Sequence, residues 1–176
     1  MHSNVFWSNL CPMKRLFIVR HGKAVHPEGQ PDFERGLTNR GLADAQALGE
    51  WTIKVRELGA PLWVSPAART QATAHHLCAA WDEPVEHIRT EPNAYLASDR
   101  AWLSWINGWP DDHQSGWIVG HNPGLSELVE RLTDQPTWLP TCGMAEVELD
   151  VDAWGEVFAG TGRLRGLFTP KSVMRP

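Results

Sequence analysis

Three short apolar runs in this chain each end in a polar segment, and this arrangement limits the folds that are open to it. Residues 16–19 are followed by Arg-His-Gly, residues 61–64 by Ser-Pro, and residues 117–119 by Gly-His-Asn. Short runs of this kind that alternate with helical patterns indicate an α/β fold with a mostly parallel sheet. Ligands of such sheets bind beyond the carboxyl ends of the strands. We therefore expect the three polar segments to meet at one edge of the sheet.

The spacing of apolar residues between these runs predicts helices. Thr38 can cap a helix that carries Leu42, Ala45 and Leu48 on its inward side. After Pro123 the apolar residues again recur at helical spacing. Together these elements predict a three-layer α/β/α arrangement, with helices on both faces of a central sheet. Further helices are expected over residues 68–81 and 99–107, and further strands over residues 85–88, 144–149, 157–159 and 164–168.

The composition is that of an ordinary globular domain. The chain has 176 residues, of which 42% are hydrophobic and 21% are charged. We expect residues 14–176 to form a single domain, and residues 1–13, which lack periodicity, to be a poorly structured N-terminal extension. The formal net charge of −5 disfavours a general nucleic-acid binder. An anionic ligand would therefore need a local cluster of cations.

Neither a membrane nor a metal is indicated by the sequence. No apolar run reaches the roughly 18 residues of a membrane span, and the N-terminus lacks the pattern of a signal peptide. Cys11, Cys78 and Cys142 are widely spaced, which favours free thiols in a reducing cytoplasm. His75 and His76 are adjacent on a predicted helix, so their side chains diverge and do not suit a metal. We expect a cytoplasmic protein without metal or cofactor.

The residues that the predicted fold brings together are Arg20, His21, Arg69 and His121. Guanidinium groups match the oxygens of a phosphoryl group, and the helix N-termini after the second and third runs add backbone donors. A central histidine can be a nucleophile that becomes phosphorylated, while the second histidine and the arginines stabilise the transferring oxygens. Gly22 permits a close approach of the backbone to the ligand. The pattern thus favours phosphoryl transfer without a metal.

Five segments carry a more specific pattern. They are LFIVRHGKA at residues 16–24, LTNRG at 37–41, VSPAARTQATA at 64–74, VGHNPGL at 119–125 and PTCGMA at 140–145. In this order the first four resemble the motifs of the histidine phosphatase superfamily, also called phosphoglycerate mutase-like. The short length, the GHNPGL segment and the last segment resemble its phosphohistidine phosphatase SixA branch. The resemblance covers about residues 14–170 and implies a phosphoglycerate mutase-like fold.

The resemblance also implies roles for the residues at matching positions. The phosphorylated nucleophile would be His21. The phosphate pocket would be completed by Arg20, Arg69 and His121, and its rim would be shaped by Arg35 and Asn122. Other residues that can lie at this pocket are Lys23, His26 and Tyr95.

A general acid is the part of the site that the sequence does not identify. Larger relatives carry an acidic residue for this role in an insertion that this chain is too short to hold. Glu91 and Asp99 lie in the corresponding stretch, and Asp32 lies in the polar loop of residues 26–36. No motif singles out any of the three, and a solvated loop carboxylate is the simpler interpretation of each.

The missing acid bears on the substrate. An imidazole leaves a phosphoryl group far more readily than an alkoxide does, so a proton donor matters less for phosphohistidine. We therefore expect a protein phosphohistidine phosphatase that acts in cytoplasmic signal transduction, with an open, shallow pocket. Its partner would be a phosphorylated protein or a small phosphate ester, and neither nucleic acid nor a membrane. Two alternatives stay open: a broad small-molecule phosphomonoesterase, and a non-catalytic module that binds phosphorylated partners.

Overall fold

The computed structural model describes residues 13–173. The extension expected over residues 1–13 therefore lies almost wholly outside the described residues. The strands are β1 (Lys14–Arg20), β2 (Leu62–Val64), β3 (Ile88–Thr90), β4 (Ser115–Gly120), β5 (Met144–Leu149) and β6 (Gly162–Phe168). The α-helices are α1 (Asn39–Thr52), α2 (Ala68–Trp81), α3 (Asp99–Ile106), α4 (Gly124–Thr133) and α5 (Pro170–Val173). The short 3-10 helices are η1 (Asp32–Glu34), η2 (Val85–His87) and η3 (Trp154–Glu156).

The strands form one six-stranded sheet in the order β3-β2-β4-β1-β5-β6. The first four strands in this order are parallel, and β5 and β6 join the β1 edge in antiparallel orientation. The expected α/β fold is confirmed, and the sheet is mixed. The strands β5 and β6 are consecutive and no α-helix separates them, and strands joined in this way pair in antiparallel orientation.

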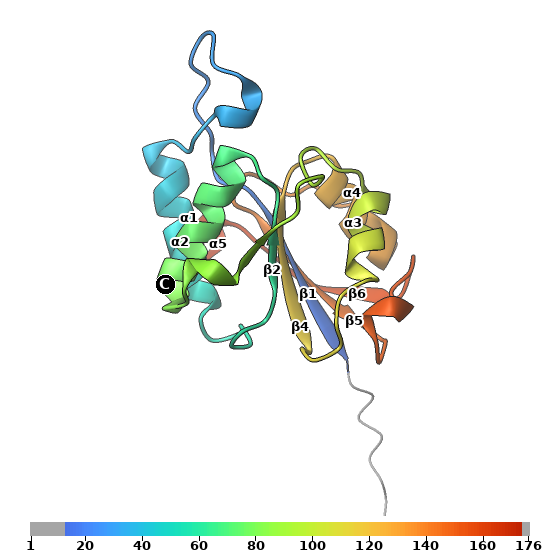
Figure 1. Cartoon of the computed structure of the whole chain (residues 1–176). Coiled ribbons are helices and arrows are strands. Elements are labelled where there is room, and N and C mark those ends of the chain that lie inside the picture. Colours follow the sequence, from blue (N-terminus) through green and yellow to red (C-terminus); the bar gives the residue numbers. More distant parts are fainter. Residues whose placement is uncertain (1–12, 174–176) are drawn as a thin grey trace, which may run out of the picture.

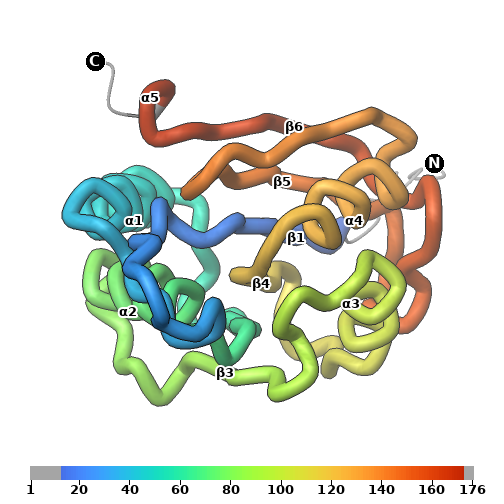
Figure 2. Tube along the Cα trace, turned by 90° about the horizontal axis from the view of Figure 1, so that it is seen from above, coloured from blue at the N-terminus to red at the C-terminus, as the bar shows by residue number. Residues whose placement is uncertain are grey.

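Helices cover both faces of the sheet, so the expected three layers are confirmed. Helices α1, α2 and α5 lie on one side of the sheet and α3 and α4 on the other (Figure 1; Figure 2). Along β1, Leu16 and Ile18 pack into the core on the α3–α4 side, whereas Phe17 and Val19 pack on the α1–α2 side. All four side chains are fully buried, as expected for a strand that is covered on both faces.

The start of α1 follows its sequence signal. The Thr38 hydroxyl accepts a hydrogen bond from the backbone N–H of Gly41 at 3.0 Å, which is the expected cap. Ala45 and Leu48 are buried, and Leu42 is half-buried. Within residues 13–173, no helix has both the length and the apolar character that a membrane crossing requires.

Two expected strands were wrong. Residues 85–88 form η2 for most of their length, because Pro84 begins a turn in which its carbonyl accepts from the N–H of His87. The pairing strand, β3, starts only at Ile88. Residues 157–159 follow η3, and the N–H of Val157 donates to Trp154 within that turn, so it is not available to a sheet.

Candidate active site

The register of the parallel strands brings two histidines to the same edge of the sheet. Arg20 of β1 pairs with Gly120 of β4, so His21 and His121 follow at the same level. β2 is parallel to β4 and ends one residue before Ser65. Figure 2 looks down on this edge, where the chain leaves β1 and turns toward α1. The site is therefore placed by strand pairing rather than by the loops alone.

The ring of His21 is held with one nitrogen unprotonated. Its Nδ1 lies 2.8 Å from the carbonyl oxygen of Gly22, which can only accept, so Nδ1 carries the proton. Nε2 is then an unprotonated acceptor, and Nε of Arg69 donates to it at 3.2 Å. Burial, aided by the charges of Arg69 and Arg20, lowers the pKa of His21 to about 4. At neutral pH this ring is a neutral nucleophile.

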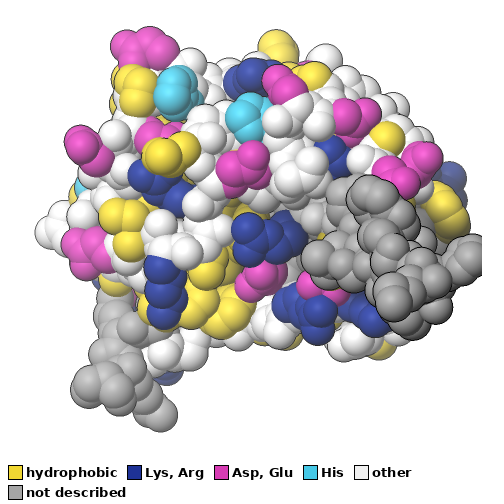
Figure 3. All heavy atoms as spheres, turned by 90° about the horizontal axis from the view of Figure 1, so that it is seen from below, with side chains coloured by type: hydrophobic (Ala, Val, Ile, Leu, Met, Phe, Trp, Pro, Cys, Tyr) yellow, Lys and Arg dark blue, Asp and Glu magenta, His cyan; other side chains and the backbone are white. Residues whose placement is uncertain are grey.

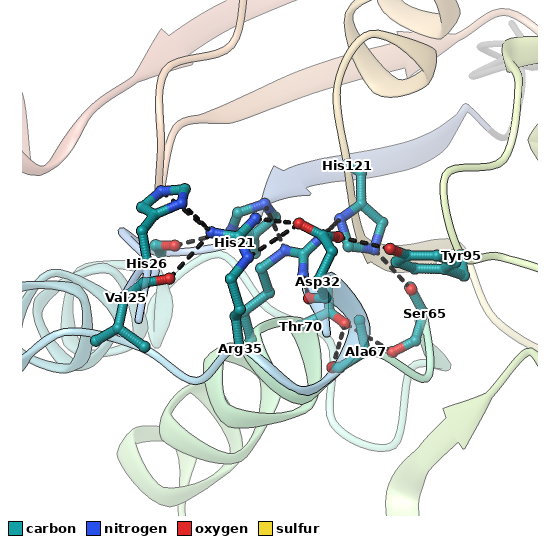
Figure 4. A network of polar contacts seen from close by, with 12 residues as sticks. His21, Val25, His26, Asp32, Arg35, Ser65, Ala67, Thr70, Tyr95 and His121 are labelled. Atoms are coloured by element: carbon teal, nitrogen blue, oxygen red, sulfur yellow. Dashed lines mark hydrogen bonds and ion pairs between the residues drawn. The ribbon is translucent and has the colours of Figure 1, made fainter. Parts of the chain in front are cut away.

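Arg69 connects the parts of the site. It lies in the first turn of α2 and is 2% exposed. Its Nη2 contacts Nδ1 of His121 at 3.3 Å and the carboxylate of Asp32 at 2.9 Å, and its Nη1 donates to the Asp32 carbonyl at 2.6 Å. These three partners of Arg69, which are His21, His121 and Asp32, lie close together in Figure 4. The N–H groups of this planar guanidinium can donate to the oxygens of a bound phosphoryl group in place of their present acceptors.

His121 is held in the opposite tautomer. Its Nδ1 accepts from Arg69, so Nε2 carries the proton and donates to Oγ of Ser65 at 2.8 Å. Burial, with the nearby His21 and Arg69, lowers the pKa of His121 to about 3. Ser65 was not singled out by the sequence interpretation. Its position directly after β2 is the signal that would have indicated it.

Arg20 is fixed from the other side of the site. Its Nη1 donates to the carbonyl oxygen of Leu139 at 2.8 Å, and the Trp138 ring lies 5.8 Å from its guanidinium carbon. Nε of Arg20 is buried without a hydrogen-bond partner among the described residues. Asn122 donates to the same Leu139 carbonyl at 2.9 Å and accepts from Ser126. Asn122 therefore holds the segment that positions Arg20.

A second cluster covers Arg69 from the side of η1. The carboxylate of Asp32 accepts from the Tyr95 hydroxyl at 2.5 Å and from Nε of Arg35 at 2.9 Å, as well as from Arg69. These bonds, that from Tyr95 foremost, hold the pKa of Asp32 far below its ordinary value. The Tyr95 ring meets the His121 ring edge-on, with centroids 5.5 Å apart. Tyr95 thus belongs to the site, although it lies far along the sequence from every motif.

Gly22 has a different role from the expected one. Its N–H donates to Oγ1 of Thr73 at 3.0 Å and is not directed at a ligand. A Cβ at this position would lie 2.8 Å from the carbonyl oxygen of Gly41. The glycine therefore allows the loop after β1 to pack against α1, and the backbone that it brings close is that of the protein.

Two of the three general-acid candidates lie away from the cavity. Glu91 accepts from the N–H of Asn93 and closes a local turn, and Asp99 pairs with Arg131 on α4. Asp32 is the candidate that the structure brings to the site.

The site opens into a cavity of about 910 Å³. Three histidines (His21, His26 and His121) and Asn122 line it, together with six basic but only two acidic side chains, so the cavity is cationic on a chain of net charge −5. Within the described part of the chain, no group of His, Cys, Asp and Glu side chains is arranged to hold a metal ion. The charged lining residues are Arg20, Lys23, Arg35, Arg40, Arg69, Lys171, Asp32 and Asp44.

The described cysteines are not reactive groups. Cys78 and Cys142 are buried, and burial raises the pKa of Cys78 to about 11 and that of Cys142 to about 12. Both are therefore protonated at neutral pH, and thiolate chemistry at these positions is disfavoured.

Comparisons with known proteins agree with this geometry. Residues 16–91 match the model of the histidine phosphatase superfamily (branch 1). An uncharacterized protein of Mycobacterium tuberculosis (strain H37Rv) is 26% identical over 167 residues, which cover 87% of this chain and 100% of that protein.

Solved structures share the fold. A protein from Agrobacterium tumefaciens that is proposed to be the phosphohistidine phosphatase SixA is 26% identical, with a TM-score of 0.73 over 90% of this chain and 99% of that chain. The protein histidine phosphatase SixA in complex with tungstate is 20% identical, with a TM-score of 0.76 over 89% and 97%. The matched segment contains His21 and Arg69, and the shared fold covers 90% of the chain. The chain is therefore similar to the histidine phosphatase superfamily over residues 16–91 and shares its fold with the SixA proteins, and together these similarities support a phosphatase.

Proposed function

We propose that this phosphatase removes the phosphoryl group from phosphohistidine on a protein, with His21 as the nucleophile. The proposal is supported by a neutral Nε2 on His21, the two arginines beside it, and the shared fold with the SixA proteins. Both described cysteines are free, as is usual in a reducing compartment, and we extend the proposal to a role in cytoplasmic signal transduction.

We favour phosphohistidine over a phosphate ester as the substrate because Asp32 is ionised and cannot donate a proton. A phosphate ester needs a proton for its alkoxide leaving group, and a carboxylic acid is the usual donor. The carboxylate of Asp32 accepts three side-chain partners, Tyr95, Arg35 and Arg69, and is held without a proton. A phosphohistidine whose second ring nitrogen is protonated leaves as neutral imidazole and needs no such donor.

The first step transfers the phosphoryl group to the enzyme. Nε2 of His21 attacks phosphorus in line, the new N–P bond forms, and the bond to the substrate imidazole breaks. Arg69 and Arg20 neutralise the equatorial oxygens, and the Nδ1–H of His21 stays hydrogen-bonded to Gly22. The positive charge that develops on the His21 ring is thereby stabilised by a carbonyl dipole.

The second step restores the enzyme. Water attacks the phosphorus of phospho-His21, the bond to Nε2 breaks, and both protons of the water leave with inorganic phosphate. His21 departs as the same neutral Nδ1–H tautomer from which it started, so no residue has to supply a proton to it.

A small phosphate ester is the second candidate substrate. The cavity of about 910 Å³ lies within the range that small-molecule sites occupy. In that case Asp32 would have to gain a proton when the substrate neutralises Arg69 and Arg35.

One comparison tests the proposal. Phosphate release would be measured from a phosphohistidine peptide and from para-nitrophenyl phosphate, with a chelator present, for the wild type, His21→Ala and His75→Ala. His75 is exposed on α2 outside the cavity, so its variant controls for loss of a histidine. We expect the wild type and His75→Ala to prefer the peptide, and His21→Ala to lose about 10³-fold or more in rate.

The other outcomes are equally informative. A preference for the ester would replace the proposal with the small-molecule phosphomonoesterase. Full activity of His21→Ala would overturn the assignment of the nucleophile, whichever substrate is turned over.

A further inference from the structure

The cavity extends beyond the phosphate site toward the starts of α1 and α5. Three basic residues line this part, which we call the cationic arm: Lys23, Arg40 and Lys171. The carboxylate of Asp44 lines the cavity on the same helix as Arg40. None of these side chains contacts His21, Arg69 or His121, so the mechanism leaves the arm unused.

The fold holds the three basic residues of the arm at one place. The backbone carbonyl of Lys23 accepts from the N–H of Thr38 at 2.8 Å and from its hydroxyl at 3.1 Å, which fixes Lys23 beside the start of α1. Arg40 lies in the first turn of that helix. Helix α5 packs against α1, beside which it lies in Figure 2, and Lys171 lines the same cavity as Arg40.

The charge of the arm is only partly compensated. Lys23 and Lys171 are exposed and form no ion pair with any residue in the described range. Arg40 pairs with Asp44 at 3.6 Å, but its side chain remains 65% exposed. The first turn of α1 holds no acidic residue, so the positive end of the helix adds to the cations.

The charged side chains are arranged differently on the part of the opposite face that Figure 3 draws in colour. Basic and acidic side chains are interspersed there, as Figure 3 shows. Six of the 16 Lys and Arg residues but two of the 21 Asp and Glu residues line the cavity, so its lining is basic on a chain of net charge −5. Charges placed this way attract an anion and orient it before contact.

We propose that the cationic arm binds acidic side chains that flank the phosphohistidine on the substrate protein. The inference rests on the proposed function and narrows its substrates to proteins with acidic residues beside the phosphohistidine. The inner site already contains Arg20 and Arg69 for the phosphoryl oxygens, so the arm is left for a second anionic group. Because Lys23, Arg40 and Lys171 are exposed at the rim, carboxylates on a protein surface can reach them.

The test uses two phosphohistidine peptides of equal length, one flanked by Glu and Asp and the other by Gln and Asn. We expect the wild type to prefer the acidic peptide on the order of tenfold in kcat/KM, mostly through KM. The preference should vanish in the triple variant Lys23→Gln, Arg40→Gln, Lys171→Gln, and should shrink at high salt. Lys54→Gln, an exposed lysine of the same charge outside the cavity, should keep the preference.

Failure of the proposal for the cationic arm can be distinguished from failure of the proposed function. Equal turnover of both peptides by the wild type would overturn the arm and leave the proposed function standing. If neither peptide is hydrolysed, the proposed function fails, and the affinities of the same two peptides carrying a stable phosphonate analogue then decide on the arm. Equal affinities, or a triple variant that keeps the preference, would reject it. The triple variant would also be compared with the wild type on small phosphate esters that bear a carboxylate. If it slows only these esters and neither peptide, the arm does not bind a substrate protein.

Discussion

Nε of Arg69 lies 3.2 Å from Nε2 of His21, and the same guanidinium reaches Nδ1 of His121 at 3.3 Å. Each N–H donates to a ring nitrogen that must therefore be unprotonated. Arg69 thus contacts the unprotonated nitrogen of each histidine, while burial is the main reason why both rings are neutral. The same side chain therefore contacts the attacking nitrogen of His21 and carries a positive charge that can stabilise the transferring oxygens.

Replacing Arg69 by lysine should separate charge from geometry. Lysine keeps the positive charge but has no planar fork that reaches two rings and a carboxylate at once. We expect kcat/KM to fall about 10²- to 10³-fold, since this is the usual effect of losing a transition-state donor. Single-turnover rates measure it, with Arg100→Lys, an exposed arginine outside the cavity, as the matched control. Near-wild-type rates in Arg69→Lys would show that charge alone is sufficient.

The two buried histidines should make stability depend on pH. Burial lowers the pKa of His21 to about 4 and that of His121 to about 3, from an ordinary value of 6.5. Between these values the unfolded chain binds more protons than the native protein, so the free energy of unfolding falls as the pH falls. Each histidine should remove about 2 kcal/mol between about pH 7 and about pH 5. Urea titrations at the two pH values measure the loss.

A variant assigns this loss to a residue. His121→Gln removes one titrating group and retains a donor for Ser65, so its stability should change by about 2 kcal/mol less over the same interval. His75→Gln, exposed on α2, should follow the wild type. Identical pH profiles for His121→Gln and the wild type would mean that His121 is not held neutral by the fold.

Replacing Asp32 by asparagine should tighten the binding of phosphate. The carboxylate takes hydrogen bonds from Arg69 and Arg35, which are donors that a phosphoryl group would use. Asparagine has nearly the same shape without the charge, so inorganic phosphate should inhibit at about fivefold lower concentration. Inhibition constants for phosphate measure this, with Asp112→Asn, an exposed aspartate outside the cavity, as control. Weaker inhibition would show that Asp32 holds Arg69 in place and does not compete with the ligand.

The parts of the fold that could be predicted from the sequence are those with local causes. The strand around residues 16–19 is apolar on both faces, and Thr38 caps its helix through a bond to Gly41. The failures were at residues 85–88 and 157–159, where apolar residues occur within a 3-10 turn or directly after one. A short apolar run does not reveal whether its N–H groups bond within a turn or across a sheet, because that depends on neighbours far along the chain.

The site shows the same division. His21 and His121 could be placed because each directly follows a strand, and parallel strands end at the same level. Tyr95 and the Leu139 carbonyl reach the site from loops, so their contribution depends on tertiary contacts that no motif encodes. The ionisation of Asp32 likewise follows from the groups around it and not from its position in the sequence.

The segment that holds Arg20 gives the last prediction. The N–H of Leu139 donates to Oγ of Ser126, Ser126 donates to Asn122, and Asn122 and Arg20 both donate to the Leu139 carbonyl. Ser126→Ala leaves the buried N–H of Leu139 without a partner and should lower the free energy of unfolding by about 1–3 kcal/mol. Asn122→Ala should retain the hydrogen bond from the Leu139 N–H to Ser126 and lose the one from Asn122 to the Leu139 carbonyl.

If this network positions Arg20, both variants should weaken phosphate inhibition to a similar extent, about three- to tenfold, despite their different effects on stability. Phosphate inhibition and urea titration, measured on the same preparations, separate the two effects. Thr137→Ala, in the same segment but bonded only to Gln135, is the matched control and should change neither quantity appreciably. Phosphate inhibition that tracks stability across the set would mean that the network supports the fold alone. We expect weaker phosphate inhibition in both variants and a loss of stability mainly in Ser126→Ala. The reason is that the guanidinium of Arg20 is positioned by its hydrogen bond to the Leu139 carbonyl, which the network holds.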